Sequence, residues 1–310
     1  MKFAFVFPGQ GSQSVGMLND LSASYPIVKH TYEQASEVLK QDLWKLVVDG
    51  PAEELNQTMN TQPAMLAASY ACWQVFTGAT EERAQIAAGH SFGEVSALTC
   101  AGAIGFEDAV LLARKRGELM QSAVPDGVGA MAAILGLDDE SIENLCKQVH
   151  ANDKVIEAVN YNAPGQVVVA GHSTAIDEFV DLAKEQGAKR ALKLPVSVPA
   201  HSSLMRAAAD QFAEVLTAID MQLPEMTVLQ NATLASPDSV ESLKAALQAQ
   251  LYSPVRWVDT INQVGEFEVE CVFELGPGKV LTGLNKRINK GIKSAGIFDN
   301  ASLEAALQLI

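Results

Sequence analysis

The pentapeptide GHSFG at positions 89–93 places a serine between two glycines in the pattern G-x-S-x-G. An apolar run at 85–88 precedes it, and a helical pattern follows it. A serine on a sharp strand-to-helix turn exposes its hydroxyl above the sheet, at a helix N-terminus that favours negative charge. The crowded backbone of such a turn requires small neighbours, here Gly89 and Gly93. We therefore predict Ser91 as a nucleophile; a glycine–serine turn that arose by chance is the alternative.

A serine nucleophile needs a base, because its hydroxyl is a weak nucleophile at its ordinary pKa, and histidine is the usual choice. The chain has five histidines. His90 is expected to point away from Ser91 in the predicted turn. His201 lies where the chain returns from 126–197 to its flanking part, in a loop of the kind that often carries catalytic groups. We predict His201 as the base, with a structural histidine at a helix start as the alternative.

Arg116 lies in the middle of the apolar stripe of a helix predicted over 106–121. A buried guanidinium is costly unless a carboxylate or phosphate pairs with it, and its planar fork fits a carboxylate bidentately. The partner is either one of the 37 acidic residues or a negative group of a substrate close to Ser91. The stripe consists of Ala109, Leu112, Ala113, Leu119 and Met120, with Leu111 on the opposite side.

The segment GQGSQS at 9–14 follows an apolar run at 2–7 and resembles a phosphate-binding loop only in part. Ser14 stands where G-x-G-x-x-G requires its third glycine, and no G-K-[ST] sequence ends the segment. A glycine turn beside Ser91 can instead donate a backbone N–H to an oxyanion. The second donor would be the N–H of Phe92, the residue after the nucleophile.

The elements that position these residues alternate between strand and helix, which predicts an α/β fold. We expect one parallel-sheet domain formed by 1–125 and 198–310, and a small domain, 126–197, inserted between its two parts. The inserted segment has strands at 130–137, 155–160, 166–170 and 188–194 and helices at 138–149 and 174–186, the β-α-β-β-α-β order of a ferredoxin-like unit. The flanking segments have strands at 2–7, 85–88, 226–230 and, as the final strand, 269–275, with helices at 27–48, 53–60, 63–76, 106–121 and 203–219.

Composition narrows the classes of function. The 310 residues are 48% hydrophobic and 19% charged, and the formal net charge of −15 disfavours nucleic acid and anionic membrane surfaces as partners. The four cysteines lack C-x-x-C spacing, which predicts neither a zinc site nor a redox pair and fits a reducing cytoplasm. The apolar run near the N-terminus is too short for a signal peptide, and no run is long enough for a membrane helix.

Several spaced motifs occur together in this chain: FPGQGSQ at 7–13, TQPA at 61–64, GHSFGE at 89–94, Arg116–Gly117, NAPGQ at 162–166, His201 and GPGK at 276–279. In this order they resemble the malonyl-CoA:acyl carrier protein transacylase family of bacterial fatty-acid synthesis, and the resemblance covers almost the whole chain. The resemblance implies an α/β-hydrolase-like parallel-sheet domain with an inserted ferredoxin-like domain, in agreement with the predicted order of elements.

The resemblance also implies a role for each matching residue. Ser91 would attack the malonyl thioester, and His201 would serve as general base and then as general acid. The backbone N–H groups of Gln10 and Phe92 would hold the oxyanion. Arg116 would bind the free carboxylate of the malonyl group.

Two glutamines complete the implied site. A backbone carbonyl orients the histidine in this family, and Gln250 matches that position; Gln62 would line the pocket. The implied substrates are malonyl-CoA and acyl carrier protein, and the reaction is a ping-pong transfer through a malonyl-serine ester. We expect a cytoplasmic monomer with no metal and no permanently bound cofactor, because coenzyme A enters as part of the thioester substrate.

The chain departs from the family pattern at two places. Phe92 stands where many members carry leucine, although a backbone N–H makes the side chain secondary. The VPAH sequence at 198–201 matches neither tetrapeptide that marks malonyl or methylmalonyl choice in related polyketide acyltransferases, so the extender unit stays open.

Because acyl carrier proteins are acidic, we expect docking to use a cluster of basic residues. Two clusters in the sequence qualify, and an ordinary solvent-exposed charged surface is the alternative explanation for each of them. These are Lys184, Lys189, Arg190 and Lys193, and Lys286, Arg287, Lys290 and Lys293.

Two other classes of function use some of the same features. A serine hydrolase, either a lipase or a thioesterase, would share the serine turn, but the inward Arg116 and the lack of an obvious acidic third member disfavour it. A carrier-binding or nucleotide-binding module built on the glycine turn would form no covalent adduct, and the defective glycine spacing disfavours it. A serine hydrolase would transfer its acyl group to water, whereas a transferase would transfer it to a thiol, so the identity of the acceptor distinguishes the two.

Overall fold

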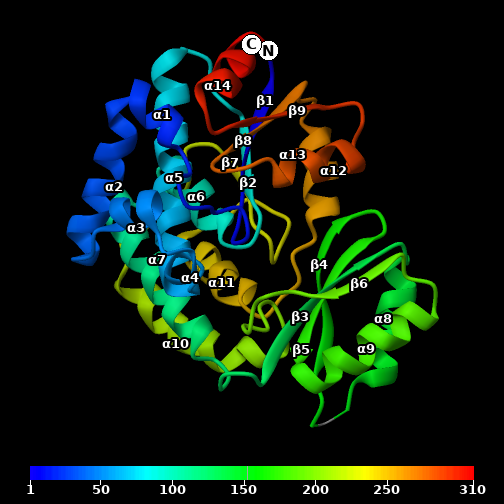
Figure 1. The fold of residues 1–310 in the computed structure, drawn as a ribbon. Coiled ribbons are helices and arrows are strands. Elements are labelled where there is room, and N and C mark those ends of the chain that lie inside the picture. Colours follow the sequence, from blue (N-terminus) through cyan, green and yellow to red (C-terminus); the bar gives the residue numbers. More distant parts are fainter. Residues whose placement is uncertain (152) are drawn as a thin grey trace.

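The computed structural model describes residues 1–151 and 153–310 and contains two β-sheets with helices packed on their faces (Figure 1). The larger sheet is parallel, with strand order β7-β2-β1-β8-β9, and the smaller is antiparallel, with order β4-β5-β3-β6. The strands are β1 Phe3–Phe7, β2 Ile86–Gly89, β3 Gly129–Leu135, β4 Ile156–Ala163, β5 Gln166–His172, β6 Arg190–Lys193, β7 Thr227–Leu229, β8 Cys271–Leu275 and β9 Lys293–Ile297.

Helices make up most of the rest of the described chain. Those of the first third are α1 Asn19–Ser24, α2 Pro26–Leu39, α3 Leu43–Asp49, α4 Ala52–Leu55, α5 Thr58–Ala79, α6 Gly93–Cys100 and α7 Phe106–Gln121. The later ones are α8 Asp139–Val149, α9 Ser173–Glu185, a 3-10 turn Ser203–Met205, α10 Arg206–Ala218, α11 Val240–Gln250, α12 Trp257–Glu266, α13 Val280–Ile288 and α14 Asn300–Leu307.

The central strand β1 is buried on both faces, because it lies between β2 and β8 and both faces carry helices. Its three phenylalanines, at 3, 5 and 7, face one layer, where the rings of Phe3 and Phe5 pack edge-on against Phe76 of α5. Ala4 and Val6 face the opposite layer with Trp257 of α12. This period-two alternation therefore separates the two helical layers of the larger sheet.

The smaller sheet also has two different faces. Ala132 and Ile134 of β3 pack with helices α8 and α9. The residues that alternate with them belong to a separate apolar cluster, which contains Met131 and Val168. This second face turns toward the larger sheet and leaves a cavity between the two.

The sequence predicted most elements but missed several boundaries. The predicted helix 27–48 is two helices, because Lys40 adopts a left-handed conformation (φ 53°) and Asp42 caps α3 by accepting a hydrogen bond from the Lys45 N–H. The predicted break between 60 and 63 is absent, since Pro63 lies inside the continuous helix α5. The strand predicted to be the last, at 269–275, is followed by β9, which pairs in parallel with β8. No helix among the described residues is long and apolar enough to cross a membrane.

Candidate active site

The serine turn lies between β2 and α6, at the carboxyl end of the parallel sheet. A Cβ added to Gly89 would lie 1.9 Å from the carbonyl carbon of Gly93, and one added to Gly93 would lie 2.1 Å from the carbonyl oxygen of Phe7. Glycine is therefore required at both positions. Ser91 between them has a φ of 52°, a left-handed conformation that is uncommon for residues other than glycine and is often found at functional sites.

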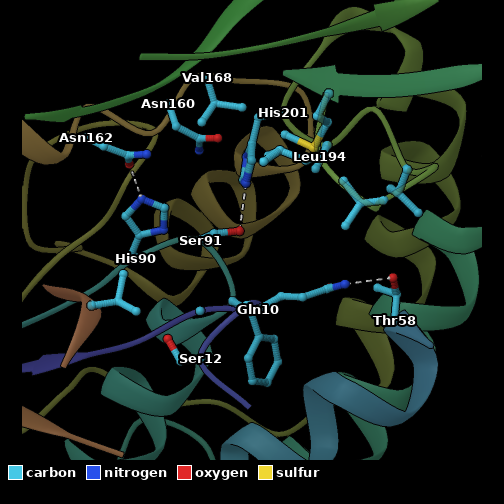
Figure 2. A pocket seen from close by; sticks show the side chains of 18 of the residues that line it. Gln10, Ser12, Thr58, His90, Ser91, Asn160, Asn162, Val168, Leu194 and His201 are labelled. Carbon is cyan, nitrogen blue, oxygen red and sulfur yellow. Dashed lines mark hydrogen bonds between the residues drawn. The ribbon is translucent and has the colours of Figure 1, made fainter. Parts of the chain in front are cut away.

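Ser91 contacts the predicted base directly (Figure 2). Its hydroxyl oxygen lies 2.7 Å from Nε2 of His201, and the Nδ1–H of His201 donates to the main-chain carbonyl of Gln250 at 2.8 Å. Because a carbonyl can only accept, this bond fixes Nδ1 as the donor and leaves Nε2 free to accept the Ser91 proton. The arrangement is a serine–histidine dyad in which a backbone carbonyl orients the ring.

Burial keeps the dyad histidine neutral. His201 is 3% exposed, and burial, reinforced by the positive charge of Arg116, lowers its pKa to about 3. The imidazole is thus unprotonated at neutral pH and can accept a proton from Ser91.

Arg116 on α7 is 1% exposed and lines the same cavity as Ser91 and His201. Its Nη2 donates to the side-chain oxygen Oε1 of Gln250 at 2.7 Å, and its guanidinium carbon lies 5.9 Å from the centre of the Phe92 ring. Nε has no hydrogen-bond partner within the described part of the chain. Burial lowers the pKa of Arg116 to about 10, so the side chain stays cationic at neutral pH. Arg116 therefore supplies a desolvated positive charge with donor capacity to spare.

Gln250 lies at the end of α11, behind this cavity, and contacts several members of the site. Its main-chain oxygen orients His201, and its side-chain oxygen accepts from Arg116. Its amide nitrogen Nε2 donates to Glu94 at 2.7 Å and to the main-chain oxygen of Ser91 at 3.0 Å. The residue is completely buried. One glutamine thus joins the cation, the base and the serine turn.

Two residues that the sequence analysis did not single out hold the serine turn. The Asn231 side chain accepts from the Ser91 N–H at 2.8 Å and donates to the Gly89 oxygen at 2.7 Å. The Asn231 N–H donates to Glu94. Burial raises the pKa of Glu94 to about 7. The Glu94 position lay in the quoted GHSFGE motif, whereas Asn231 belongs to none of the motifs and only the fold brings it to the turn.

Gln10 and Phe92 occupy the two positions predicted for oxyanion donors. Both line the cavity, and within the described ranges neither backbone N–H has a hydrogen-bond partner. The side chain of Gln10 points away to Thr58, to which its Nε2 donates at 3.3 Å (Figure 2). The cavity that contains Ser91 is therefore bordered by two residues whose backbone N–H groups are free to donate.

His90 was expected to point away from Ser91, and the structure gives it a more specific position. Its ring lines the same cavity, its Nε2–H donates to the side-chain oxygen of Asn162 at 2.7 Å, and its edge contacts Trp257 (Figure 2). Asn162 belongs to β4 of the smaller sheet, so this bond links that sheet to the serine turn beside Ser91. Burial lowers the pKa of His90.

The cavity has a volume of about 260 Å³ and is lined by both sheets. Six of the seven predicted site residues line it, and Gln250 is the exception. Gln62 is among the six; its side-chain oxygen is buried and has no partner among the residues described. Part of the lining is apolar and comes from the smaller sheet and the segment that follows it: Met131, Val168, Leu194, Val196 and Val198.

The comparisons with known proteins agree with this geometry. The family model for the acyl transferase domain matches residues 4–303. A Haemophilus influenzae protein named malonyl CoA-acyl carrier protein transacylase is 50% identical over 310 residues, covering 100% of this chain and 99% of that protein. The Escherichia coli K12 protein of the same name is 49% identical over 308 residues, with 99% of each chain covered.

Solved structures give the same result. One is a type II polyketide synthase acyl carrier protein in complex with its malonyl-transacylase, with a TM-score of 0.98, 50% identity and full coverage of both chains. Another is an acyl carrier protein S-malonyltransferase from Vibrio cholerae, with a TM-score of 0.95, 52% identity, and 99% of this chain and 100% of that chain covered. The chain therefore belongs to the acyl transferase family and, within it, to the malonyl CoA-acyl carrier protein transacylases.

Proposed function

We propose that the chain transfers a malonyl group from malonyl-CoA to the phosphopantetheine thiol of acyl carrier protein through a malonyl-Ser91 ester. The observation that carries this proposal is the Ser91–His201 dyad, 2.7 Å apart, in one cavity with the buried cation Arg116. The curated relatives that carry the name of this activity match the whole chain at about half identity. The product supplies fatty-acid elongation.

In the first half-reaction the Ser91 hydroxyl gives its proton to Nε2 of His201 while Oγ attacks the thioester carbonyl. The negative charge that develops on the carbonyl oxygen is stabilised by the backbone N–H groups of Gln10 and Phe92. When the intermediate collapses, the carbon–sulfur bond breaks and the CoA sulfur takes the proton from His201. The enzyme is left as a malonyl ester with a neutral histidine.

The second half-reaction runs the same steps with the carrier thiol. Its proton passes to His201, its sulfur attacks the ester carbonyl, and the Ser91 oxygen leaves and recovers the proton. The partner of the His201 Nδ1–H is a main-chain carbonyl, so the dyad lacks the carboxylate that completes the triad of a typical serine hydrolase. This difference favours the transferase over the serine hydrolase that shares the turn.

The positive charge of Arg116 selects the acyl group. A malonyl unit carries a carboxylate at the end opposite its thioester, and an acetyl unit does not. Arg116 lines the cavity with donor capacity unused, so it can pair with that carboxylate while Ser91 attacks the other end. A charge-assisted hydrogen bond in a desolvated site contributes about 1.5 to 3 kcal/mol, which corresponds to roughly ten- to a hundredfold preference.

We also propose the domain division expected from the sequence. Residues 1–125 and 198–310 would form an α/β-hydrolase-like domain, and 126–197 a ferredoxin-like insert. The parallel five-stranded sheet supports the first assignment, and the order β3-α8-β4-β5-α9-β6 with both helices on one face supports the second. The four cysteines are free and buried, in keeping with the cytoplasmic location that we propose.

For the acyl carrier protein we propose docking beside α13, at the cluster Lys286, Arg287, Lys290 and Lys293. Arg287 donates to the side chain of Gln166, which lines the cavity, and to the main-chain oxygen of Pro164. Its charge therefore lies at the rim of the site. In the second cluster, by contrast, Lys184 and Lys193 are paired with Asp181 and Asp177, which lowers their net attraction for an acidic partner.

The proposed intermediate can be detected directly. Mixing the protein with malonyl-CoA should increase its intact mass by one malonyl group, because Ser91 is the only nucleophile that the dyad activates. The Ser91→Ala variant should show no increase. A stable adduct in that variant, or none in the natural protein, would contradict the proposal.

The role of Arg116 can be tested by substitution. Arg116→Ala should lower the ratio of kcat/KM for malonyl-CoA to that for acetyl-CoA by roughly ten- to a hundredfold, since only malonyl loses a charged partner. Arg114→Ala is the matched control, because Arg114 on the same helix contacts Asn60 and Gln41 instead of the cavity. An unchanged ratio in Arg116→Ala would exclude the assignment.

The neutral state of His201 predicts the pH dependence of Ser91 acylation. The pKa of His201 is lowered to about 3, so the base form persists as the pH falls through 6.5. The acylation rate with acetyl-CoA, which carries no carboxylate to interact with Arg116, should change by less than about twofold from pH 8 to pH 6, whereas an ordinary histidine would lose about fourfold. Rapid-quench mass spectrometry measures this rate, and a half-loss at pH 6.5 would refute the prediction.

Charge reversal tests the docking surface. The double variant Lys286→Glu/Arg287→Glu should slow transfer from malonyl-Ser91 to acyl carrier protein by about tenfold at low salt and weaken its salt dependence. Acylation by malonyl-pantetheine, which lacks the phosphates of CoA, should be unchanged. Lys184→Glu/Lys189→Glu in the other cluster is the control. The assignment fails if transfer to the carrier is unaffected by the first pair.

A further inference from the structure

Glu94 is a buried carboxylate that the proposed reaction does not use. It lies in the first turn of α6, is completely buried and does not line the cavity. Its Oε2 accepts from the side-chain nitrogen of Gln250 at 2.7 Å and from the Asn231 N–H at 2.8 Å, and its Oε1 accepts from Gln230 at 3.2 Å. All of these partners are donors, and at pH 8, above its pKa of about 7, the carboxyl is mostly ionised. Burial disfavours this charge, and the three hydrogen bonds offset part of that cost.

The contact with Gln250 fixes which way its amide group faces. The nitrogen end of that amide donates to Glu94 and to the main-chain oxygen of Ser91, and the oxygen end accepts from Nη2 of Arg116. A flipped amide would direct its N–H₂ group at a guanidinium that can only donate, and its oxygen at a carboxylate that can only accept. The amide thus bridges an anion and a cation that share no direct bond.

This bridge determines which hydrogen-bond donors of Arg116 remain free to bind a substrate. One amino group of the guanidinium is bonded to Gln250, while Nε has no partner among the described residues and the side chain borders the cavity. A bidentate salt bridge from a carboxylate such as Glu94 would use two of the guanidinium nitrogens, whereas Gln250 uses only Nη2. The amide holds the cation from behind and leaves the rest of its donors for the acyl group.

We propose that Glu94 is a positioning residue for acyl selection, which orients the Gln250 amide and, through it, the guanidinium of Arg116 toward the carboxylate of the acyl group. This inference rests on the proposed malonyl transfer. Glu94 reaches Arg116 only through Gln250, and it does not line the cavity. Its second contact, with the Asn231 N–H, supports the serine turn, which malonyl and acetyl transfer use alike. Its removal should therefore impair malonyl transfer more than acetyl transfer.

The test compares four proteins at pH 8: Glu94→Ala, Glu94→Gln, Gln250→Ala and the double variant Glu94→Ala/Gln250→Ala. The readout is the malonyl-to-acetyl ratio of kcat/KM, with acetyl transfer as the internal measure of an intact dyad. Glu94→Ala should lower the ratio by about tenfold, the effect of losing one charge-assisted contact. Glu94→Gln should keep it within about threefold, because a glutamine oxygen can still accept from Gln250.

The double-mutant cycle separates positioning from a general loss of structure. If Glu94 acts through Gln250, adding Glu94→Ala to Gln250→Ala should change the ratio no further, because the bridge is already gone. The main-chain carbonyl that orients His201 remains in both backgrounds. Independent, additive effects would overturn the proposal, as would equal losses of malonyl and acetyl transfer in Glu94→Ala, or a Glu94→Gln ratio as low as that of Glu94→Ala.

If Glu94→Ala does not fold, the variant Glu94→Asp takes its place. Glu94→Asp keeps the charge but withdraws it by one methylene from Gln250, so it should lower the ratio in the same direction; an unchanged ratio would overturn the proposal. Failure of the malonyl transfer itself is recognised separately, by the absence of a malonyl adduct on the natural protein. An adduct together with an unchanged ratio in the Glu94 variants would refute the positioning role alone.

Discussion

The close crossing of the serine turn over the end of strand β1 is the constraint on which the site depends. Gly89 and Gly93 leave no room for a Cβ, and Gly93 contacts the carbonyl of Phe7. Because the backbone is held this tightly, Ser91 adopts its left-handed conformation and α6 begins immediately after it. The same crossing places the Phe92 N–H beside the glycine turn that follows β1 and directs Glu94 into the interior. The positions of the Ser91 hydroxyl, the Phe92 N–H and the buried Glu94 carboxyl group all follow from this one turn.

The charges of His201 and Arg116 follow from the burial of their side chains. Burial lowers the pKa values of both His201 and Arg116, but the value for arginine starts far higher. At neutral pH His201 is therefore neutral, while Arg116 stays charged. A carboxylate beside the imidazole would make it a stronger base, and a carboxylate on the guanidinium would consume its donors. Gln250 avoids both by contacting each with a neutral group. The site thereby keeps its positive charge available for a substrate.

The sequence predicted the residues that line the cavity better than the residues that hold them in place. Ser91 could be identified because the spacing of its glycines reflects a local steric need, and Arg116 because a cation in an apolar stripe is exceptional. Asn231 could not be found in this way, since its contact with the Ser91 N–H joins segments 140 positions apart. Strand β9 was missed because its sequence, KSAGI, is weakly apolar and owes its conformation to pairing with β8. Lys40 ends α2 by a backbone conformation that no residue-type rule assigns to lysine.

The oxygen that orients His201 belongs to the main chain of Gln250, and every amino acid at that position would supply the same atom. In a triad with a side-chain carboxylate, a single codon change can eliminate the orienting group. Here such a change removes the amide that contacts Arg116, Glu94 and the Ser91 main-chain oxygen, but it leaves the orienting carbonyl in place. Position 250 is therefore a place where natural variation can alter which acyl groups are accepted while the proton-transfer pair survives, so new substrate ranges can evolve without passing through an inactive ancestor.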